Sequence, residues 1–367
     1  MFNPEKRADL LRQKMMKNNK YLIAKIEGSG QEKDSKKVIE SFFRWKEYIG
    51  HHTPEELEWL SDSLENVWSP KYMGLSENFF FKPIEEVKKL EFQNPAYSAA
   101  YAFKKKKGDP REYRKVFAVQ VSGCTYSCNY CYVPPQVNAA DAKFGKFFSP
   151  KEIIDFFLKE RKESNEPMNV LRITGGEPTI IPEIIIDINN ELEKRNLDNV
   201  YFWNDTNLST PKYLEKLEDD LKPILQKRNV GVVGCFKGVS KQDFFKITGA
   251  DPKFYENQFE TTKLFLDWKT DFYVYLPALV YENDINNKTK DFLEKLKQLN
   301  KNLPLRVEML IIKEYPGALI NMQEKAKEGR PMPKTDQRVI FDLWYNKLLP
   351  KYYSKEMLNK FCCEISL

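Results

Sequence analysis

The stretch KVFAVQVSGCTYSCNYCY, residues 115–132, joins an apolar segment to three closely spaced cysteines. Branched and aromatic residues dominate its first half, which predicts a buried strand over Val116–Ser122. Cys124, Cys128 and Cys131 follow within nine residues of that strand. If this strand opens a parallel α/β sheet, the three thiols stand at its C-terminal edge, where such folds build their active sites.

Further apolar runs follow the first one, separated by longer amphipathic segments. This alternation is typical of repeated βα units and predicts a parallel sheet with helical crossovers. Six units are too few to close the eight-stranded barrel. We therefore expect an α/β fold, a partial (β/α)6 TIM-type barrel. The other five strands are predicted at Val170–Thr174, Val200–Asn204, Val230–Phe236, Phe272–Leu279 and Leu305–Ile311.

Helix start signals stand between the predicted strands. Ser149 precedes Pro150, Thr210 precedes Pro211, and Ser240 stands three residues before Asp243. A capping side chain with proline or acid in the first turn predicts a helix at each place. The amphipathic segments 181–196 and 284–300 predict two more.

The chain divides into three parts by pattern. We expect residues 1–114 to be a mainly helical N-terminal extension, 115–312 the barrel, and 313–367 a C-terminal loop and helix. The extension contains a predicted strand and turn within residues 18–30 and predicted helices over 36–49 and Thr53–Trp68. In the C-terminal part, proline punctuation predicts a loop over 313–335, and the apolar periodicity predicts a helix over 336–353.

Composition says more about where in the cell the protein is found than about what it binds. The chain has 367 residues, 31% of them charged, with a formal net charge of +6, so charge of both signs is spread over a solvated surface. No apolar run approaches the ~18 residues of a membrane span or resembles a signal peptide. We expect a cytoplasmic protein with reduced thiols and no membrane association, because its six cysteines do not follow a disulfide framework.

Three cysteines are one short of a closed four-thiolate site. Three thiolates can hold three irons of a [4Fe–4S] cluster and leave the fourth iron open. A structural zinc is the main alternative, but it needs further ligands, and the chain has only His51 and His52 besides its cysteines. The sequence TGGEP at the end of the second predicted strand is either a tight turn or a second functional element.

Together these two motifs resemble the radical S-adenosylmethionine (SAM) superfamily over residues 115–312. The spacing C-x-x-x-C-x-x-C with the aromatic Tyr132 after it is similar to the family's cluster signature, which implies Cys124, Cys128 and Cys131 as iron ligands. The second motif is similar to the Gly-Gly-Glu-Pro element that contacts the SAM amino group. It comprises Gly175, Gly176, Glu177 and Pro178.

The resemblance implies a reaction and its cofactors. SAM chelates the open iron of a [4Fe–4S] cluster, one electron cleaves its sulfonium bond, and a 5′-deoxyadenosyl radical abstracts hydrogen from a substrate. Such chemistry is anaerobic and needs a one-electron reductant such as flavodoxin or ferredoxin. The protein's part is to orient the reactive atoms and exclude competing reactions.

Within the superfamily, the core resembles the glycyl-radical-enzyme activases, represented by pyruvate formate-lyase activating enzyme. Asp205 begins a similar Asp-Thr-Asn stretch, which implies Asn204 or Asp205 as a ribose or cation contact, and Lys237 is implied as a cation for the SAM carboxylate. Leu208 stands where the activases have glycine, and Cys235 where they have an aspartate. These departures leave an activase-type cation site open to question.

The substrate is left open by the sequence. A protein such as a glycyl radical enzyme is one candidate, and RNA or a small metabolite is another, although the basic stretch 102–115 is better explained as a solvated hairpin turn than as an RNA contact. Cys235, Cys362 and Cys363 are expected to be small buried hydrophobes. A non-catalytic iron–sulfur protein for electron transfer is the alternative of another class, and it would not need Gly175 to Glu177 or Lys237.

Overall fold

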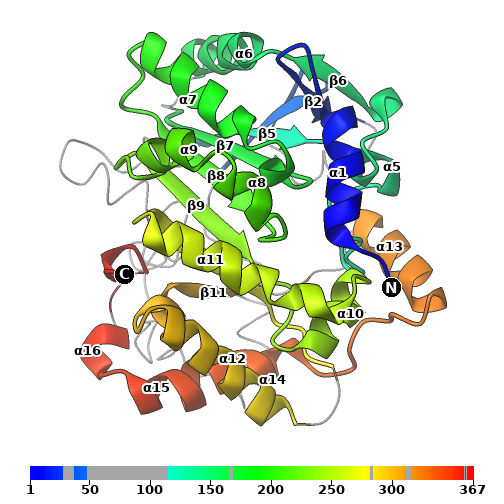
Figure 1. Ribbon diagram of the computed structural model, residues 1–367, viewed down its shortest axis with the longest axis vertical. Coiled ribbons are helices and arrows are strands. Elements are labelled where there is room, and N and C mark those ends of the chain that lie inside the picture. Colours follow the sequence, from blue (N-terminus) through cyan, green and yellow to red (C-terminus); the bar gives the residue numbers. More distant parts are fainter. Residues whose placement is uncertain are drawn as a thin grey trace.

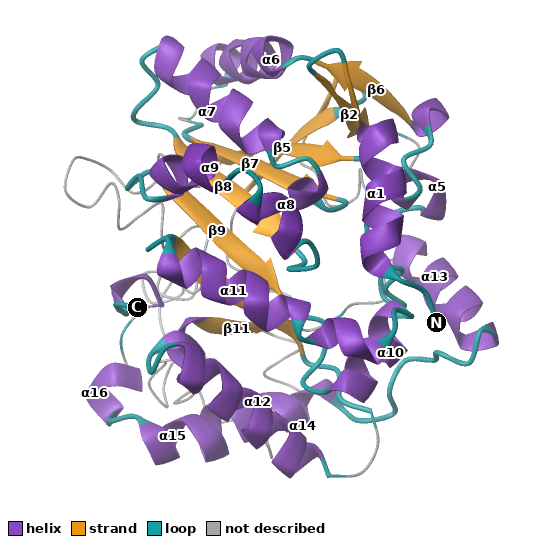
Figure 2. Ribbon diagram, viewed as in Figure 1, coloured by secondary structure: helices purple, strands orange, loops and turns teal. Residues whose placement is uncertain are grey.

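The computed structural model describes residues 1–27, 37–47, 115–164, 168–281, 284–310, 312, 316–358, 360 and 362–367. Within them, helices pack around a single curved sheet (Figures 1 and 2). Six strands of this sheet run parallel in the order β5-β7-β8-β9-β10-β11, and β11 does not pair with β5, so the barrel is open. The predicted partial barrel is therefore confirmed.

All six predicted barrel strands are present, each within two residues of its expected start. In every pair the parallel register brings the C-terminal ends to one edge of the sheet, where the cysteines follow β5. The bounds are β5 Lys115–Val121, β7 Val170–Gly175, β8 Tyr201–Thr206, β9 Val230–Cys235, β10 Asp271–Pro277 and β11 Val307–Leu310.

Helices cover the outer face of the barrel, and Figure 1 shows α8, α9 and α11 in front of the strands. The predicted start signals are confirmed at Ser149, whose hydroxyl accepts from the Glu152 N–H, and at Ser240, which caps the next such helix in the same way. Thr210 precedes α8 without capping it. The outer helices are α6 Pro150–Glu163, α7 Glu183–Lys194, α8 Pro211–Glu215, α9 Glu218–Leu225, α10 Lys241–Thr248, α11 Asn257–Asp267 and α12 Ile285–Leu299.

Side-chain alternation divides each barrel strand between two environments. Outward residues such as Phe117, Ile173 and Phe202 are buried against the helices in the main core. Inward residues near the strand starts, such as Trp203 and Tyr273, form a second apolar cluster that fills the bottom of the barrel. Apolar side chains thus pack closely on both faces of the barrel strands, and this packing holds the C-terminal edge of the sheet rigidly.

The N-terminal segment adds α1 Pro4–Met15 and a group of antiparallel strands. Helix α1 lies across the C-terminal ends of the first barrel strands (Figure 1). It is tied there by Arg12, which donates to the Ile180 carbonyl and pairs with Glu183, and by Asp9, which pairs with Lys212. The strands are β1 Met16–Lys17, β2 Lys20–Ala24, β3 Lys37–Ile39, β4 Phe43–Glu47 and β6 Gly145–Phe148.

The helix predicted over 36–49 is wrong, because its described residues form the hairpin β3–β4. Its turn places Glu40 and Ser41 at positive φ, and β4 pairs antiparallel with the free edge of β5. Pairing satisfies the backbone groups of that edge, and the Phe43 ring stacks 5.4 Å from Phe117. The strand predicted within residues 18–30 is confirmed as β2.

The loop predicted over 313–335 is also wrong in part, since it contains helix α13, Pro316–Lys327. Its proline stands at the first helical position, where the missing N–H has no cost, and Gly329 follows with φ of 77° where the chain turns away. The predicted helix over 336–353 is confirmed as α14 Gln337–Asp342, the π-helical turn η9 Leu343–Leu348 and α15 Leu349–Tyr352.

Several expectations lie outside the described residues. They are the Thr53–Trp68 helix, the basic stretch before Lys115, His51 with His52, and the side chain of Cys363. None of the helices in the described ranges combines the length and apolar character that crossing a bilayer requires.

The capping box at the start of α6 gives a test of the fold. The Ser149 N–H in turn donates to the Glu152 carboxylate at 2.7 Å. Ser149→Ala should therefore lower the free energy of unfolding by about 1 kcal/mol, measured by urea titration. Ser149→Thr keeps the hydroxyl and should stay within about 0.5 kcal/mol of the wild type. Equal losses in both variants would contradict the role of the cap.

Candidate functional site

The three cysteines lie on the loop 123–134 between β5 and the short helix α5, Pro135–Asn138. We call this segment the cysteine loop. It begins at Gly123, whose φ of 93° turns the chain out of the strand, and the N–H of Cys124 then donates to the Asn138 carbonyl at 3.0 Å. All three cysteines are half-buried free thiols.

The cysteine loop is held from outside by α10 and by the C-terminal segment. Backbone N–H groups of Ser127 and Asn129 donate to the carbonyls that end α10, at 3.2 and 2.9 Å. The Arg330 guanidinium donates to the Ser127 carbonyl at 3.0 Å, and the Asn321 amide donates to the Cys131 carbonyl. Sequence reasoning missed Asn321 and Arg330, because nothing near them resembles a motif.

Burial makes bare thiolates costly at Cys124 and Cys128. Loss of solvation, with the neighbouring Cys128 and Cys131, raises the pKa of Cys124 to about 12, and burial raises that of Cys128 to about 11. Thiolates here need a positive charge in their midst, which metal supplies. The described residues contain no group of three His, Cys, Asp or Glu side chains arranged for one ion, but a [4Fe–4S] cluster binds each cysteine at a different iron.

The Gly-Gly-Glu-Pro turn after β7 lies directly against the cysteine loop. The Glu177 N–H donates to the Gly123 carbonyl at 2.7 Å, and a Cβ on Gly176 would lie 1.9 Å from that same oxygen. Gly175 has φ of 107°, and a Cβ there would lie 2.2 Å from the Gln120 side chain. Both glycines are therefore required by the close approach of two backbones.

The Glu177 carboxylate is fully buried and occupied by the protein itself. Its two oxygens accept from the Thr179 N–H at 3.1 Å, the Thr206 hydroxyl at 2.8 Å and the Asn207 N–H at 2.5 Å. Burial raises its pKa, although these hydrogen bonds oppose the change. Glu177 thus ties the β7 turn to the β8 turn, while the backbone of Gly175 and Gly176 faces the cysteine loop. Pro178 begins the short 3₁₀ helix η6 behind it.

Asp205 and Asn204 lie on opposite faces of β8. Asp205 points into the barrel, where Arg172 donates to it at 2.7 Å and the Thr174 hydroxyl at 2.6 Å. Asn204 faces the outer helices and donates to the Gly231 carbonyl at 3.4 Å. Alternation along a strand allows only one of two neighbours to face a site inside the barrel. A ligand contact for either residue stays a prediction.

Leu208, which replaces the glycine of the activases, has φ of 62°, a conformation that glycine adopts without strain. Its side chain is fully buried and fills the space beside Gly234, where a Cβ would lie 2.8 Å from it. The backbone of this turn has kept a glycine-type conformation, and the missing side chain at Gly234 makes room for the leucine.

Lys237 and Tyr130 form a half-buried pair beside the cysteines. The Lys237 ammonium lies over the Tyr130 ring, 5.8 Å from its centre. Burial opposes the charge of Lys237, yet Tyr130 and Cys235 outweigh it and raise its pKa. Tyr132, the aromatic residue singled out from the sequence, instead packs against Val133 and Val137. Sequence reasoning missed Tyr130, although it stands between two of the cysteines.

The inner face of the barrel becomes polar and partly exposed toward its C-terminal edge. Val170 and Trp203, deep in the barrel, are fully buried, whereas Arg172, Asp205 and Cys235 one or two positions later are partly exposed. Burial raises the pKa of Cys235 to about 12. Cys235 and Cys362 pack against the inner apolar cluster but are only partly buried, whereas the sequence predicted buried residues. The barrel mouth therefore lies beside the cysteine loop.

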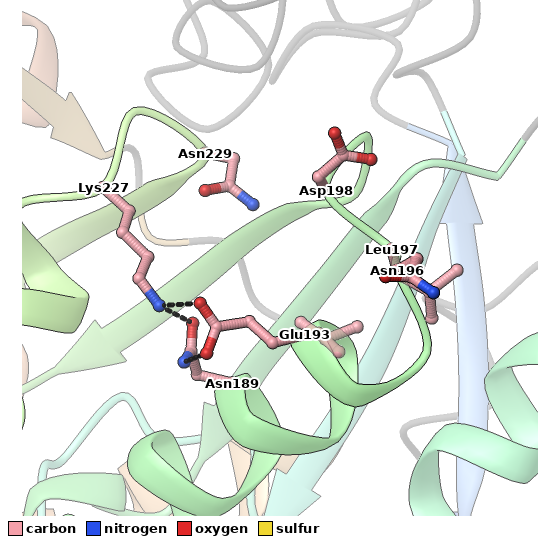
Figure 3. Close-up of a pocket in the computed structure, with 8 residues that line it drawn as sticks. Asn189, Glu193, Asn196, Leu197, Asp198, Lys227 and Asn229 are labelled. Atoms are coloured by element: carbon pink, nitrogen blue, oxygen red, sulfur yellow. Dashed lines mark hydrogen bonds and ion pairs between the residues drawn. The ribbon is translucent and has the colours of Figure 1, made fainter.

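A cavity of about 350 Å³ lies at the other end of the strands (Figure 3). Lys227 bridges Glu193 and Asn189 at its wall, and these groups satisfy one another. Its lining residues come from the end of α7 and from the segments that lead into β8 and β9, so the cavity lies at the strand starts. The cysteines follow the opposite, C-terminal end of β5. Its lining is Asn189, Leu192, Glu193, Asn196, Leu197, Asp198, Lys227 and Asn229.

Residues 120–223 match the model of the Radical SAM superfamily. The match spans the cysteine loop, the Gly-Gly-Glu-Pro turn and the β8 turn, so this segment is a radical SAM domain. The cofactors of such a domain are a [4Fe–4S] cluster and SAM. The residues present fit them, because three free, half-buried thiols lie on one loop and the turn that carries Glu177 packs directly against that loop.

Similar solved structures include two of Streptococcus suis SuiB, one of them bound to S-adenosylmethionine. Both are 15% identical with a TM-score of 0.38 over 75% of this chain, which spans 56% and 55% of their lengths. A structure of TYW1 with a lysine-pyruvate adduct bound is 13% identical, with a TM-score of 0.37, over 67% of this chain and 90% of that one. The sequence matches no curated protein. Likeness at this level says nothing about substrate.

The cysteine set can be tested by iron content. After anaerobic reconstitution, replacing Cys124, Cys128 and Cys131 with alanine should leave roughly no iron, whereas replacing Cys235, Cys362 and Cys363 should leave about four irons per chain. A wild-type chain that binds about eight irons, or clear iron loss in the second variant, would show that the single-cluster assignment is wrong.

The bare backbone at Gly176 gives a second test. Gly176→Ala should push the β7 turn off the cysteine loop and cost at least about 1–3 kcal/mol, with less iron retained after reconstitution. Gly329→Ala is the control for general destabilisation, because alanine is strained at the positive φ of Gly329 but meets no atom within 4 Å of its Cβ position. Equal iron contents in the two variants would count against the close approach.

Proposed function

We propose that this chain is a radical SAM enzyme whose [4Fe–4S] cluster is held by Cys124, Cys128 and Cys131. The observation that carries the proposal is the contact between the Gly-Gly-Glu-Pro turn and the cysteine loop, with the Glu177 N–H on the Gly123 carbonyl at 2.7 Å. This contact brings the turn that resembles the SAM amino-group element against the loop that carries the cluster cysteines, an arrangement that an electron-transfer protein does not require.

When bound, the cluster and SAM supply an electron and a 5′-deoxyadenosyl radical for hydrogen abstraction. The chain's own residues orient the amino-acid end of SAM. The half-buried ammonium of Lys237 offers a charge-assisted bond to a carboxylate. Tyr130 offers a ring face at the same place, and the Asn207 side-chain oxygen, buried with no partner among the described residues, offers an acceptor for an ammonium group.

The substrate of the radical is a polar molecule or a polar part of a larger one, because the barrel mouth carries the Arg172–Asp205 pair beside Cys235. Activation of a glycyl radical enzyme is one such reaction, suggested by the Asp205-Thr206-Asn207 stretch. Modification of RNA or of a small metabolite is the other. The reductant is an acidic one-electron carrier of the flavodoxin or ferredoxin type, and the setting is the cytoplasm.

Turnover without substrate tests the proposal. With a strong one-electron reductant and SAM, the wild type should slowly release 5′-deoxyadenosine, and SAM should change the EPR spectrum of the reduced cluster. Lys237→Gln should weaken SAM affinity roughly tenfold or more, because a charge-assisted hydrogen bond contributes about 1.5–3 kcal/mol, while iron content is retained.

Lys253→Gln is the matched control, since the side chain of this lysine is 68% exposed and contacts Asp251 and the Phe254 ring. It should bind SAM as the wild type does. If the EPR spectrum of the wild-type cluster does not change when SAM is added, and no 5′-deoxyadenosine forms, the electron-transfer alternative is favoured instead.

A further inference from the structure

Two buried asparagine amides contact sulfur atoms of the cysteine loop. The Asn207 side-chain N–H lies 3.5 Å from the Cys124 sulfur, and the Asn138 side-chain N–H lies 3.5 Å from the Cys131 sulfur. Asn207 comes from the turn after β8, and Asn138 ends helix α5. The two contacts therefore reach the cysteine loop from separate elements.

The orientation of the Asn138 amide follows from its other contact. Its nitrogen also donates to the Val133 carbonyl at 3.4 Å, and turning the amide over would set its oxygen against a carbonyl that can only accept. The Asn207 amide also contacts the Thr125 hydroxyl at 2.9 Å, which can accept or donate. Its nitrogen is the atom that suits the Cys124 sulfur, because an iron-bound thiolate carries no hydrogen and can only accept.

Both amide oxygens remain buried with no hydrogen-bond partner among the described residues. Leaving a buried acceptor unpaired disfavours the fold. Asn129, Asn204 and Asn346 also have a buried amide oxygen without a partner among the described residues, but Asn207 and Asn138 are the ones whose nitrogen contacts a cysteine sulfur, although leucine would fill a similar volume. A purely packing role accounts poorly for that choice.

The third cysteine has a different environment. No side-chain amide of the described residues hydrogen-bonds the Cys128 sulfur, which instead lies in the field of the Lys237, Arg330 and Arg7 charges. The three iron ligands are thus stabilised unequally, two by amide donors and one by distant cations.

We propose that Asn207 and Asn138 are positioning residues that raise the reduction potential of the cluster through N–H···S hydrogen bonds to Cys124 and Cys131. The inference rests on the proposed function. Reduction adds a negative charge that is shared with the ligand sulfurs, so donors to those sulfurs favour the reduced state. Asn207 also donates its backbone N–H to Glu177, which places this effect in the turn that faces SAM.

An EPR-monitored redox titration of the reconstituted protein without SAM tests the proposal. Asn207→Leu and Asn138→Leu should each lower the ratio of reduced to oxidised cluster at a fixed potential by roughly threefold to tenfold, or up to about 59 mV for one electron. The double variant should show both effects, with about four irons retained per chain.

Asn321→Leu is the matched control, because its amide contacts the backbone carbonyl of Cys131 and not the sulfur. It should leave the midpoint potential within error of the wild type. If the leucine variants lose their cluster, Asn207→Asp and Asn138→Asp carry the test. They keep the side-chain shape but replace the donor with a carboxylate, so the potential should fall further.

Midpoints in the asparagine variants that equal the Asn321→Leu midpoint would overturn the inference and leave the proposed function standing. A wild-type chain that takes up no cluster would overturn both. Because SAM is absent from the titration, failure of SAM cleavage alone does not affect the result.

Discussion

The absence of side chains where two backbones meet is the constraint on which the rest of the site depends. The Gly123 carbonyl accepts from the Glu177 N–H, and a Cβ on Gly176 would fall 1.9 Å from that oxygen. The cysteine loop and the β7 turn can approach this closely only through glycine. Because β5 and β7 pair in parallel register, both turns start at the same level of the sheet. Sheet register and local conformation together create the contact.

Glu177 extends that constraint to a third strand. Its carboxylate joins the β7 turn to Thr206 and Asn207 of the β8 turn, and Asn207 reaches back to the cysteine loop through Thr125 and Cys124. A hydrogen-bonded ring of three turns results, with every donor buried. Such a network is strong when complete and costly when broken. The acidic residue of the motif therefore serves the shape of the site at least as much as its charge.

The departures from the activase pattern have different structural consequences. Leu208 is accommodated, since its backbone keeps a left-handed conformation and Gly234 makes room for its side chain. Cys235 changes the chemistry of the mouth, because a thiol packed on an apolar cluster replaces an acid beside Lys237. Leucine is thus compatible with a conformation that glycine adopts at this turn, whereas Cys235 places a thiol where the resemblance implies an acid.

Local patterns determined the βα series, the helix caps at Ser149 and Ser240 and the chemistry of the three cysteines, because each depends on residues close in the chain. Tertiary structure decided the rest. Residues 37–47 form a hairpin because β4 pairs with the edge of β5 and satisfies its backbone groups. The pleat of β8 sets Asn204 and Asp205 on opposite faces of the sheet. Asn138, Arg330 and Tyr130 acquire their roles only where distant segments meet at the cysteine loop. Spacing along a sequence specifies which atoms are available, but the close contacts between them exist only in the packed fold.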